Sequence, residues 1–200
     1  ISLLKRKGMP AEMVAKEKID FLGYSLSVGG VSIKSAAVTK IKAQISYILS
    51  KHLLQPLRKK PLKALVIPAN NRDRSLISAM SEIRRYLYGG LTSVQILNYI
   101  HGKTRRIYFK GLMSYYPLIT DAEQLKELDG WLVSAVHHAV RARGKLLMGH
   151  GYSVWHNFPY NVPRSHIVQI YRAQSVKGKR LYEVPSLSLL HGALTAPMSE

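Results

Sequence analysis

The sequence contains no cysteine, and it has few acidic residues and no long apolar run. The lack of cysteine excludes disulfide bonds and thiolate metal sites. No apolar run approaches the about 20 residues that a membrane-spanning helix needs. The N-terminal stretch places its charges after its apolar residues, which is not the order of a signal peptide. We therefore expect a cytoplasmic protein that does not bind a membrane.

Carboxylates are scarce, with 11 Asp and Glu against 30 Lys and Arg. Most of them are isolated in the sequence, so a catalytic site built around two metal ions is not expected within this chain. The histidines offer no alternative, because the adjacent His137 and His138 face different sides of a helix and have no partners at metal-binding spacing. Neither a phosphate-binding Gly-x-x-x-x-Gly-Lys-Ser/Thr loop nor a Gly-x-Ser-x-Gly nucleophile motif is present. We expect no catalysis by this chain alone and no metal or cofactor bound by it.

The formal net charge of +19 indicates a polyanionic partner. Such an excess destabilises a compact chain by self-repulsion unless a polyanion neutralises it. Hydrophobic residues make up 46% of the chain, which is enough for a folded core. The basic residues are spread over several predicted helices and do not form the single stripe of a membrane-surface helix. RNA or DNA is therefore the expected partner.

The stretch from Lys18 to Lys34 predicts a β-hairpin. Apolar and small polar residues alternate from Ile19 to Val28, Gly29-Gly30 turns the chain, and Val31-Ser32-Ile33 returns it. Gly23 lies inside the first predicted strand. A glycine there indicates a bulge or a close approach by another backbone or a ligand.

The remainder of the chain predicts helices and then an irregular C-terminal extension. Apolar spacings, capping residues and helix-breaking Gly or Pro residues predict helices over residues 35 to about 54, 75–88, 92–100, 106–116 and 120–145. Two overlapping capping boxes mark the start of the last helix, whose expected core face is Leu125, Leu128, Leu132, Ala135 and Ala139. Asp129 on this helix is expected to bond a neighbouring basic side chain or an indole N–H. Beyond residue 145 the pattern breaks up, and only a basic turn at 177–180 and a short helix over 187–194 are predicted.

Four segments, taken in order, resemble a known family. The tetrapeptide Phe21-Leu22-Gly23-Tyr24, at a hairpin directly before basic helices, resembles the last conserved block of reverse transcriptase palms. Downstream stand Ile83-Arg84-Arg85-Tyr86-Leu87-Tyr88-Gly89, Phe109-Lys110-Gly111-Leu112-Met113-Ser114-Tyr115-Tyr116 and Leu128-Asp129-Gly130-Trp131. Together these segments are similar to the thumb of group II intron and related bacterial reverse transcriptases, most of all to the abortive-infection and defence-associated branch.

The resemblance implies a mainly α fold, in which a β-hairpin from the end of a polymerase palm is followed by a helical thumb bundle and an irregular extension. The corresponding domains are residues 1–34 (end of the palm with the primer-grip hairpin), 35–145 (thumb) and 146–200 (C-terminal extension). The implied function is to grip template–primer duplex or a structured RNA for an RNA-directed DNA polymerase in bacterial antiphage defence. A non-catalytic helical RNA-binding protein is the alternative.

One motif of that family, the Tyr-x-Asp-Asp turn, is absent from this sequence. In the family this turn lies a little before the Phe-Leu-Gly-Tyr block, so here it would fall upstream of Ile1. The resemblance thus implies that the catalytic aspartates and the Mg²⁺ of the complete polymerase belong to another segment or chain, which carries the fingers and the catalytic palm. This chain would then be the C-terminal part of a larger or split polymerase.

The resemblance assigns the primer grip, which positions the primer 3′ end, to Phe21, Leu22, Gly23 and Tyr24. Guanidinium and ammonium groups suit phosphate oxygens, and an aromatic ring can stack on a base or a ribose. The predicted nucleic-acid-binding residues are Arg72, Arg74, Arg84, Arg85, Lys103, Arg105, Arg106, Lys110, Tyr115, Arg141 and Arg143. The alternative for Tyr115 is a place in the core, and for Arg141 and Arg143 it is a favourable interaction with the C-terminal end of a helix dipole. The basic run Arg58-Lys59-Lys60 is interpreted as a solvated loop.

Overall fold

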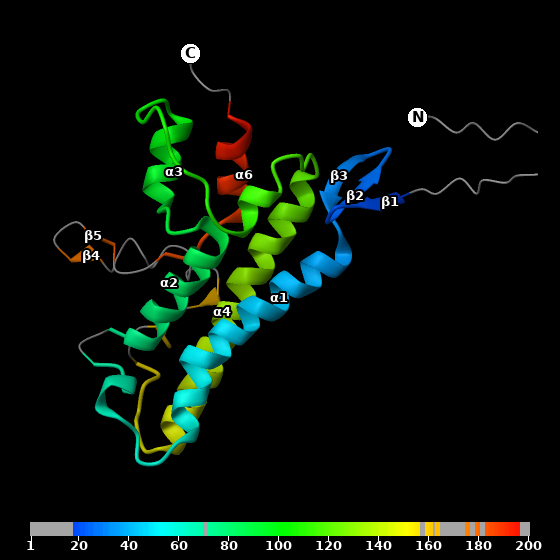
Figure 1. The fold of residues 1–200 in the computed structure, drawn as a ribbon. Coiled ribbons are helices and arrows are strands. Elements are labelled where there is room, and N and C mark those ends of the chain that lie inside the picture. Colours follow the sequence, from blue (N-terminus) through cyan, green and yellow to red (C-terminus); the bar gives the residue numbers. More distant parts are fainter. Residues whose placement is uncertain are drawn as a thin grey trace, which may run out of the picture.

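The structure is a computed structural model that describes residues 18–69, 72–156, 159–161, 163–164, 175–176, 179–180 and 183–196. Its fold is mainly helical, with a small antiparallel sheet attached at one end of the helical body (Figure 1). The predicted combination of helices with a short β-hairpin region is thereby confirmed. Residues 1–17 of the predicted palm end lie outside the described residues.

The first half of the helical body consists of two long helices and a connector of short turns. Helix α1 (Ser35–Leu49) continues through a π-helical turn, η1 (Ser50–Leu54), and a 3-10 turn, η2 (Gln55–Arg58). A further 3-10 turn, η3 (Ala64–Val66), leads to α2 (Arg74–Tyr88). The end of α2 is the predicted one, because Gly89 takes the left-handed conformation, with φ of 68°, that commonly ends helices.

The second half contains α3 (Ser93–Ile100), the 3-10 turn η4 (Leu112–Tyr115), α4 (Ala122–Gly149) and α6 (Leu187–Thr195). The predicted capping box is present at the start of α3, and the Asp121 carboxylate caps α4 by accepting from a backbone N–H at 3.0 Å. Between α4 and α6, β4 (Ser175–Val176) pairs with β5 (Lys179–Arg180). The residues of the predicted basic turn between these strands, 177–178, lie outside the described part. No helix in the described part combines the length and the apolar character that crossing a membrane requires.

The helix predicted over residues 106–116 is wrong, because only η4 is helical there. The backbone at Gly111 has φ of 106°, which is not helical. A Cβ atom added at Gly89 would lie 1.9 Å from the carbonyl oxygen of Lys110. The segment before η4 therefore packs backbone against backbone on the end of α2, and two glycines make this close approach possible.

The sheet is a meander of three strands, β1 (Lys18–Phe21), β2 (Tyr24–Ser27) and β3 (Gly30–Ile33), paired in that order. The prediction of one continuous strand through Gly23 is therefore wrong. Leu22 and Gly23 form a two-residue turn, with φ of 46° and 90°, and Phe21 pairs with Tyr24 across it. Positive φ at both central residues is the geometry that suits the twist of a tight hairpin. Gly23 is thus a turn residue and not a strand glycine.

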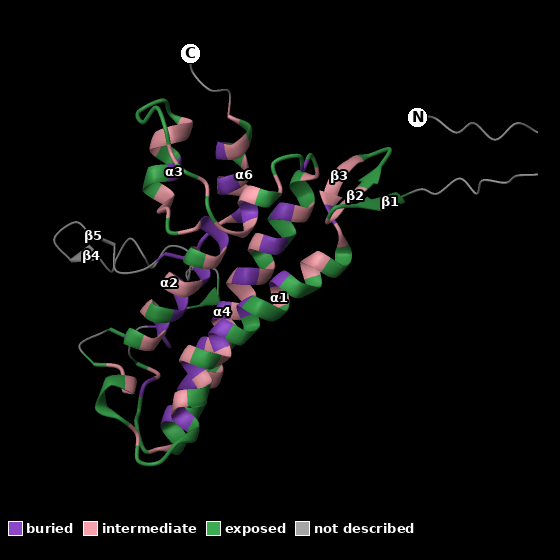
Figure 2. Cartoon of the chain, in the orientation of Figure 1, coloured by how far each residue is buried: buried purple, intermediate pink, exposed green. Residues whose placement is uncertain are grey.

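The buried side chains form one hydrophobic core between α1, α2, α4 and α6, and Figure 2 marks the buried positions along these helices in purple. The buried stripe of α4 departs from the predicted one, because Ala135 and Ala139 are only half-buried. Leu125, Leu128 and Leu132 are buried as predicted, and the stripe continues with Val136, Val140 and Leu147 instead of the two alanines.

Helix α4 crosses the predicted domain boundary at residue 145 and ends at Gly149. Beyond it, Val154, Tyr160 and three residues of α6 belong to the same core: Leu187, Leu190 and Ala193. The residues around Val154 and Tyr160 and the helix α6 are therefore packed into the helical body.

Candidate nucleic-acid interface

The sheet is fixed to the helical body through the outer edge of β3. The Gln124 side chain of α4 accepts from the Ile33 N–H at 2.7 Å and donates to the Ile33 carbonyl at 2.9 Å. The Thr120 hydroxyl accepts from the Val31 N–H at 2.8 Å, and the Thr120 N–H donates to the Val31 carbonyl at 2.9 Å. These bonds satisfy the β3 edge as a further strand would, so the sheet is held at a defined angle to α4.

The four predicted primer-grip residues divide into two anchoring and two exposed ones. Tyr24 donates a hydrogen bond to the Tyr115 carbonyl at 2.9 Å, and its ring meets that of Tyr116 edge to face, with 5.5 Å between centroids. A Cβ at Gly23 would lie 3.4 Å from the Tyr116 hydroxyl. By contrast, Phe21 is 62% exposed and Leu22 is 81% exposed. The turn therefore presents two apolar side chains to solvent from a firmly anchored base.

A salt bridge closes the base of the sheet. The Lys34 ammonium lies 3.1 Å from the Asp20 carboxylate, which joins the end of β3 to β1. The hydrogen bond from Lys34 holds the pKa of Asp20 below its ordinary value. Both side chains are well exposed, so this pair contributes little to stability.

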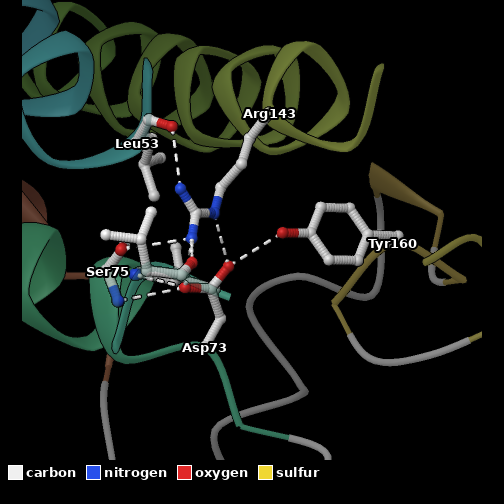
Figure 3. Close-up of polar contacts among 7 residues, drawn as sticks. Leu53, Asp73, Ser75, Arg143 and Tyr160 are labelled. Carbon is white, nitrogen blue, oxygen red and sulfur yellow. Dashed lines mark hydrogen bonds and ion pairs between the residues drawn. The ribbon is translucent and has the colours of Figure 1, made fainter. Parts of the chain in front are cut away.

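Arg143 is fully buried, and its predicted role in binding nucleic acid is wrong. Its guanidinium donates to both carboxylate oxygens of Asp73, at 2.7 and 3.2 Å, as Figure 3 shows. It also donates to the Leu53 carbonyl at 2.9 Å and to the Ser75 hydroxyl at 3.1 Å. Each of the three guanidinium nitrogens therefore has a partner inside the protein, and the buried group is not accessible to a phosphate.

Tyr160 completes this buried network, because its hydroxyl donates to Asp73 at 2.8 Å. Burial, and next the neighbouring Asp73 carboxylate, raise the pKa of Tyr160. The network joins α4, the start of α2, the turn η1 and the segment after α4 around one neutralised charge pair. It had no counterpart in the sequence predictions, although Arg143 stands three residues after Val140 and four before Leu147 on the buried stripe of α4.

The network also sets the direction of the two arginines beside Asp73. Asp73 has extended backbone angles, with φ of −111° and ψ of 101°, and caps α2 by accepting from the Ser75 and Leu76 N–H groups. In extended backbone, neighbouring side chains point to opposite sides. Because Asp73 points inward, Arg72 and Arg74 point outward together, and both are exposed.

The two outward-pointing arginines line one hollow of about 450 Å³. Its other lining residues come from the connector before α2: Ala64, Leu65, Ile67 and Ala69. None of the described residues that line it is acidic, so no described carboxylate neutralises the two positive charges from within the hollow. We refer to this feature as the arginine hollow. It brings together two of the predicted nucleic-acid-binding residues.

The other predicted residues are distributed over the surface. Arg84 lies 3.8 Å from the buried carboxylate of Glu183, and its charge is therefore largely engaged. The Arg141 guanidinium lies 4.7 Å from the centre of the Trp155 ring and donates to the Tyr160 carbonyl at 2.6 Å, so it holds the segment after α4 in place. The remaining cations are all exposed: Arg85, Lys103, Arg105, Arg106 and Lys110. Tyr115 is 75% exposed, so its ring is not part of the core and remains open for stacking.

Asp129 has a different role from the predicted one. Its carboxylate accepts from the Ser186 hydroxyl at 2.7 Å and from the backbone N–H groups of Leu187 and Ser188 at 2.6 and 3.2 Å. The first N–H groups of a helix lack partners within the helix, and an acidic side chain at that end satisfies them. Asp129 thereby attaches α6 to α4, and the expected bond to a basic side chain or an indole is wrong.

Within the described residues, no group of three or more His, Asp or Glu side chains is placed to hold a metal ion. The Mg²⁺ that the resemblance implies does not fit any group of side chains in this part of the chain. We therefore derive no catalytic step from these residues.

Comparison of the chain with models of protein families, with curated proteins and with solved structures found no match. No family is therefore established for it. The function has to be inferred from its charge, its exposed residues and the resemblance of its motifs.

Proposed function

We propose that this chain grips nucleic acid through backbone phosphates, as the primer-grip hairpin and thumb of an RNA-directed DNA polymerase do. The observation that carries the proposal is the arginine hollow. The Asp73 carboxylate between Arg72 and Arg74 is neutralised inside the core by Arg143, so both flanking charges face solvent. Cations placed in this way attract a polyanion of any sequence, because phosphate contacts carry no base information.

The hairpin supplies the second part of the proposed grip. Phe21 and Leu22 are exposed at a turn whose base is anchored by Tyr24 and Gln124. An anchored apolar turn is suited to lie against the sugar of a primer terminus without losing its position. Chemistry at that terminus, including the binding of Mg²⁺, belongs in this proposal to a partner segment that carries the catalytic aspartates.

Fluorescence anisotropy with an RNA–DNA hybrid tests the binding. For about 6–10 phosphate contacts, affinity should fall about 10³- to 10⁵-fold between about 50 and 200 mM salt. Replacing both Arg72 and Arg74 by Ala should reduce the slope of log K against log salt by about 2, for all sequences alike. Lys40→Ala with Lys126→Ala is the matched control, because both lysines are exposed and neither lines the arginine hollow. A flat salt dependence of the unmodified chain would contradict the proposal.

The choice of substrate separates a primer grip from the alternative of a non-catalytic RNA-binding protein. Phe21→Ser with Leu22→Ser should weaken binding to a hybrid with a recessed 3′ end more than binding to a blunt one. Both side chains are exposed, so these changes should leave the unfolding temperature nearly unchanged. An equal loss on both ligands would favour the non-catalytic RNA-binding protein.

A further inference from the structure

A second basic hollow lies next to the arginine hollow. It measures about 430 Å³ and is lined by four lysines and by neighbouring residues of the connector: Lys51, Lys59, Lys60, Lys63, Gln55, Pro56, Pro61 and Val66. We call it the lysine hollow. Lys51 is paired with Glu82 at 3.0 Å. Among the residues that the structure describes, no carboxylate lies within ion-pair distance of the other three lysines. The sequence predicted a solvated loop at Arg58-Lys59-Lys60 and gave no sign that lysines from this region line one hollow.

The turn η3 separates the two hollows as a ridge. Lys63 and Val66 line the lysine hollow, whereas Ala64, Leu65 and Ile67 line the arginine hollow. Leu65 is 65% exposed, so the ridge carries an apolar side chain. Consecutive residues of one short turn thus face two basic hollows.

Hydrogen bonds from the protein interior fix the backbone that lines the two hollows. The Val66 carbonyl on the ridge accepts a hydrogen bond from the buried Arg143 guanidinium. In η2, which lines the lysine hollow through Gln55 and Pro56, the Leu57 carbonyl lies 2.7 Å from Nε2 of His150 at the end of α4. The basic side chains are therefore carried by backbone that is fixed to α4 at two points.

We propose that one nucleic-acid strand crosses the η3 ridge and places backbone phosphates in both hollows. Ammonium groups are compact point charges that can donate to phosphate oxygens from many directions, whereas guanidinium forks bind phosphate in a fixed geometry. A small anion would fill one hollow only, whereas a strand presents a charge at each nucleotide and can occupy both sides of a ridge. The exposed Leu65 then lies against the sugar between the two phosphates. The inference rests on the proposed function, because both hollows bind the same nucleic acid.

The test measures the salt dependence of binding for a lysine-hollow variant, Lys60→Gln with Lys63→Gln. Each phosphate contact contributes about 0.9 to the slope of log K against log salt on duplex, so the variant should lose about 1–2 in slope. The control, Lys40→Gln with Lys126→Gln, removes the same charge elsewhere and should change the slope by less. Circular dichroism should show both variants as folded as the unmodified chain, since all four side chains are exposed.

The outcomes distinguish the ridge from the wider proposal. A steep slope for the unmodified chain, together with an unchanged slope for the lysine-hollow variant, overturns the ridge crossing and leaves nucleic-acid binding intact. A flat slope for the unmodified chain overturns both. Pyrophosphate serves as the small-anion probe: if the variant loses only pyrophosphate binding and keeps its slope on the hybrid, the hollow is a site for a small anion and not for a strand.

Discussion

Removal of the buried guanidinium by Arg143→Met should destabilise the fold severely. Methionine fills most of the space but donates to none of the acceptors that Arg143 satisfies: the Asp73 carboxylate, the Ser75 hydroxyl and the Leu53 and Val66 carbonyls. The Asp73 charge would remain buried with only Tyr160 and two backbone N–H groups as partners. Breaking a buried pair in this way costs about 3–5 kcal/mol.

For a chain of this size, about 1 kcal/mol corresponds to about 2–4 °C in Tm, so Arg143→Met should lower the unfolding temperature by about 6–20 °C. Thermal and urea unfolding followed by circular dichroism measure the loss. Arg141→Met on the same helix is the control. It removes one hydrogen bond and one exposed cation–π contact, which together are worth about 1–2 kcal/mol.

A double-mutant cycle then isolates the pair. Asp73→Asn retains a side-chain oxygen for the α2 cap but removes the charge, so the double variant should be more stable than the sum of the two single losses indicates, by about 1–3 kcal/mol. If Arg143→Met cost no more than Arg141→Met, the view of Arg143 as a structural residue would be refuted.

Three further experiments, with four substitutions, test individual contacts. Gly89→Ala should lower the free energy of unfolding by several kcal/mol, because its Cβ would lie 1.9 Å from the Lys110 carbonyl oxygen. Gly130→Ala should stabilise α4 by about 1 kcal/mol, because its Cβ meets nothing within 4 Å. If urea unfolding showed the Gly89 variant to be the more stable of the two, this packing would be contradicted. Asp129→Ala should lower the free energy of unfolding by about 1–2 kcal/mol and increase the rate of hydrogen exchange in α6 more than in α2. An equal increase in both helices would mean that Asp129 does not cap α6. The hydrogen bond from His52 lowers the pKa of Glu82 below its ordinary value of 4.5. The free energy of unfolding should therefore be larger for the unmodified chain than for Glu82→Gln at a pH above that value, and this difference should disappear as the pH falls through the folded-state pKa of Glu82. A difference that persists at pH ~2 would contradict the lowered pKa.

Except for the helix wrongly predicted over residues 106–116, the helices were predictable from the sequence because their signals are local. The capping pair Thr92 and Gln95, the terminating Gly89 and the apolar spacing of α4 each act within a few residues. The turn at Leu22 and Gly23 was missed because the alternation of apolar residues continues through it. Leu22 is also a rare residue at positive φ, so no turn-forming pair marks the site.

The buried network was missed for a different reason. Arg143 and Asp73 are 70 residues apart, and no local pattern distinguishes an arginine that meets a buried partner from an exposed one. Its position on the apolar stripe of α4 was the available signal. The lysine hollow likewise depends on how the connector folds back between η2 and η3, and a charge run alone does not contain that information.

The most direct test of nucleic-acid gripping is residue-level footprinting of the cations with and without a bound RNA–DNA hybrid. Arginine- and lysine-specific reagents followed by mass spectrometry would report each side chain separately. We predict protection of Arg72, Arg74, Lys60 and Lys63 on binding, with Lys40 and Lys126 unchanged. Arg143 should resist modification in both states, because it is buried. Equal modification of the two hollows with and without the hybrid would contradict the proposed interface.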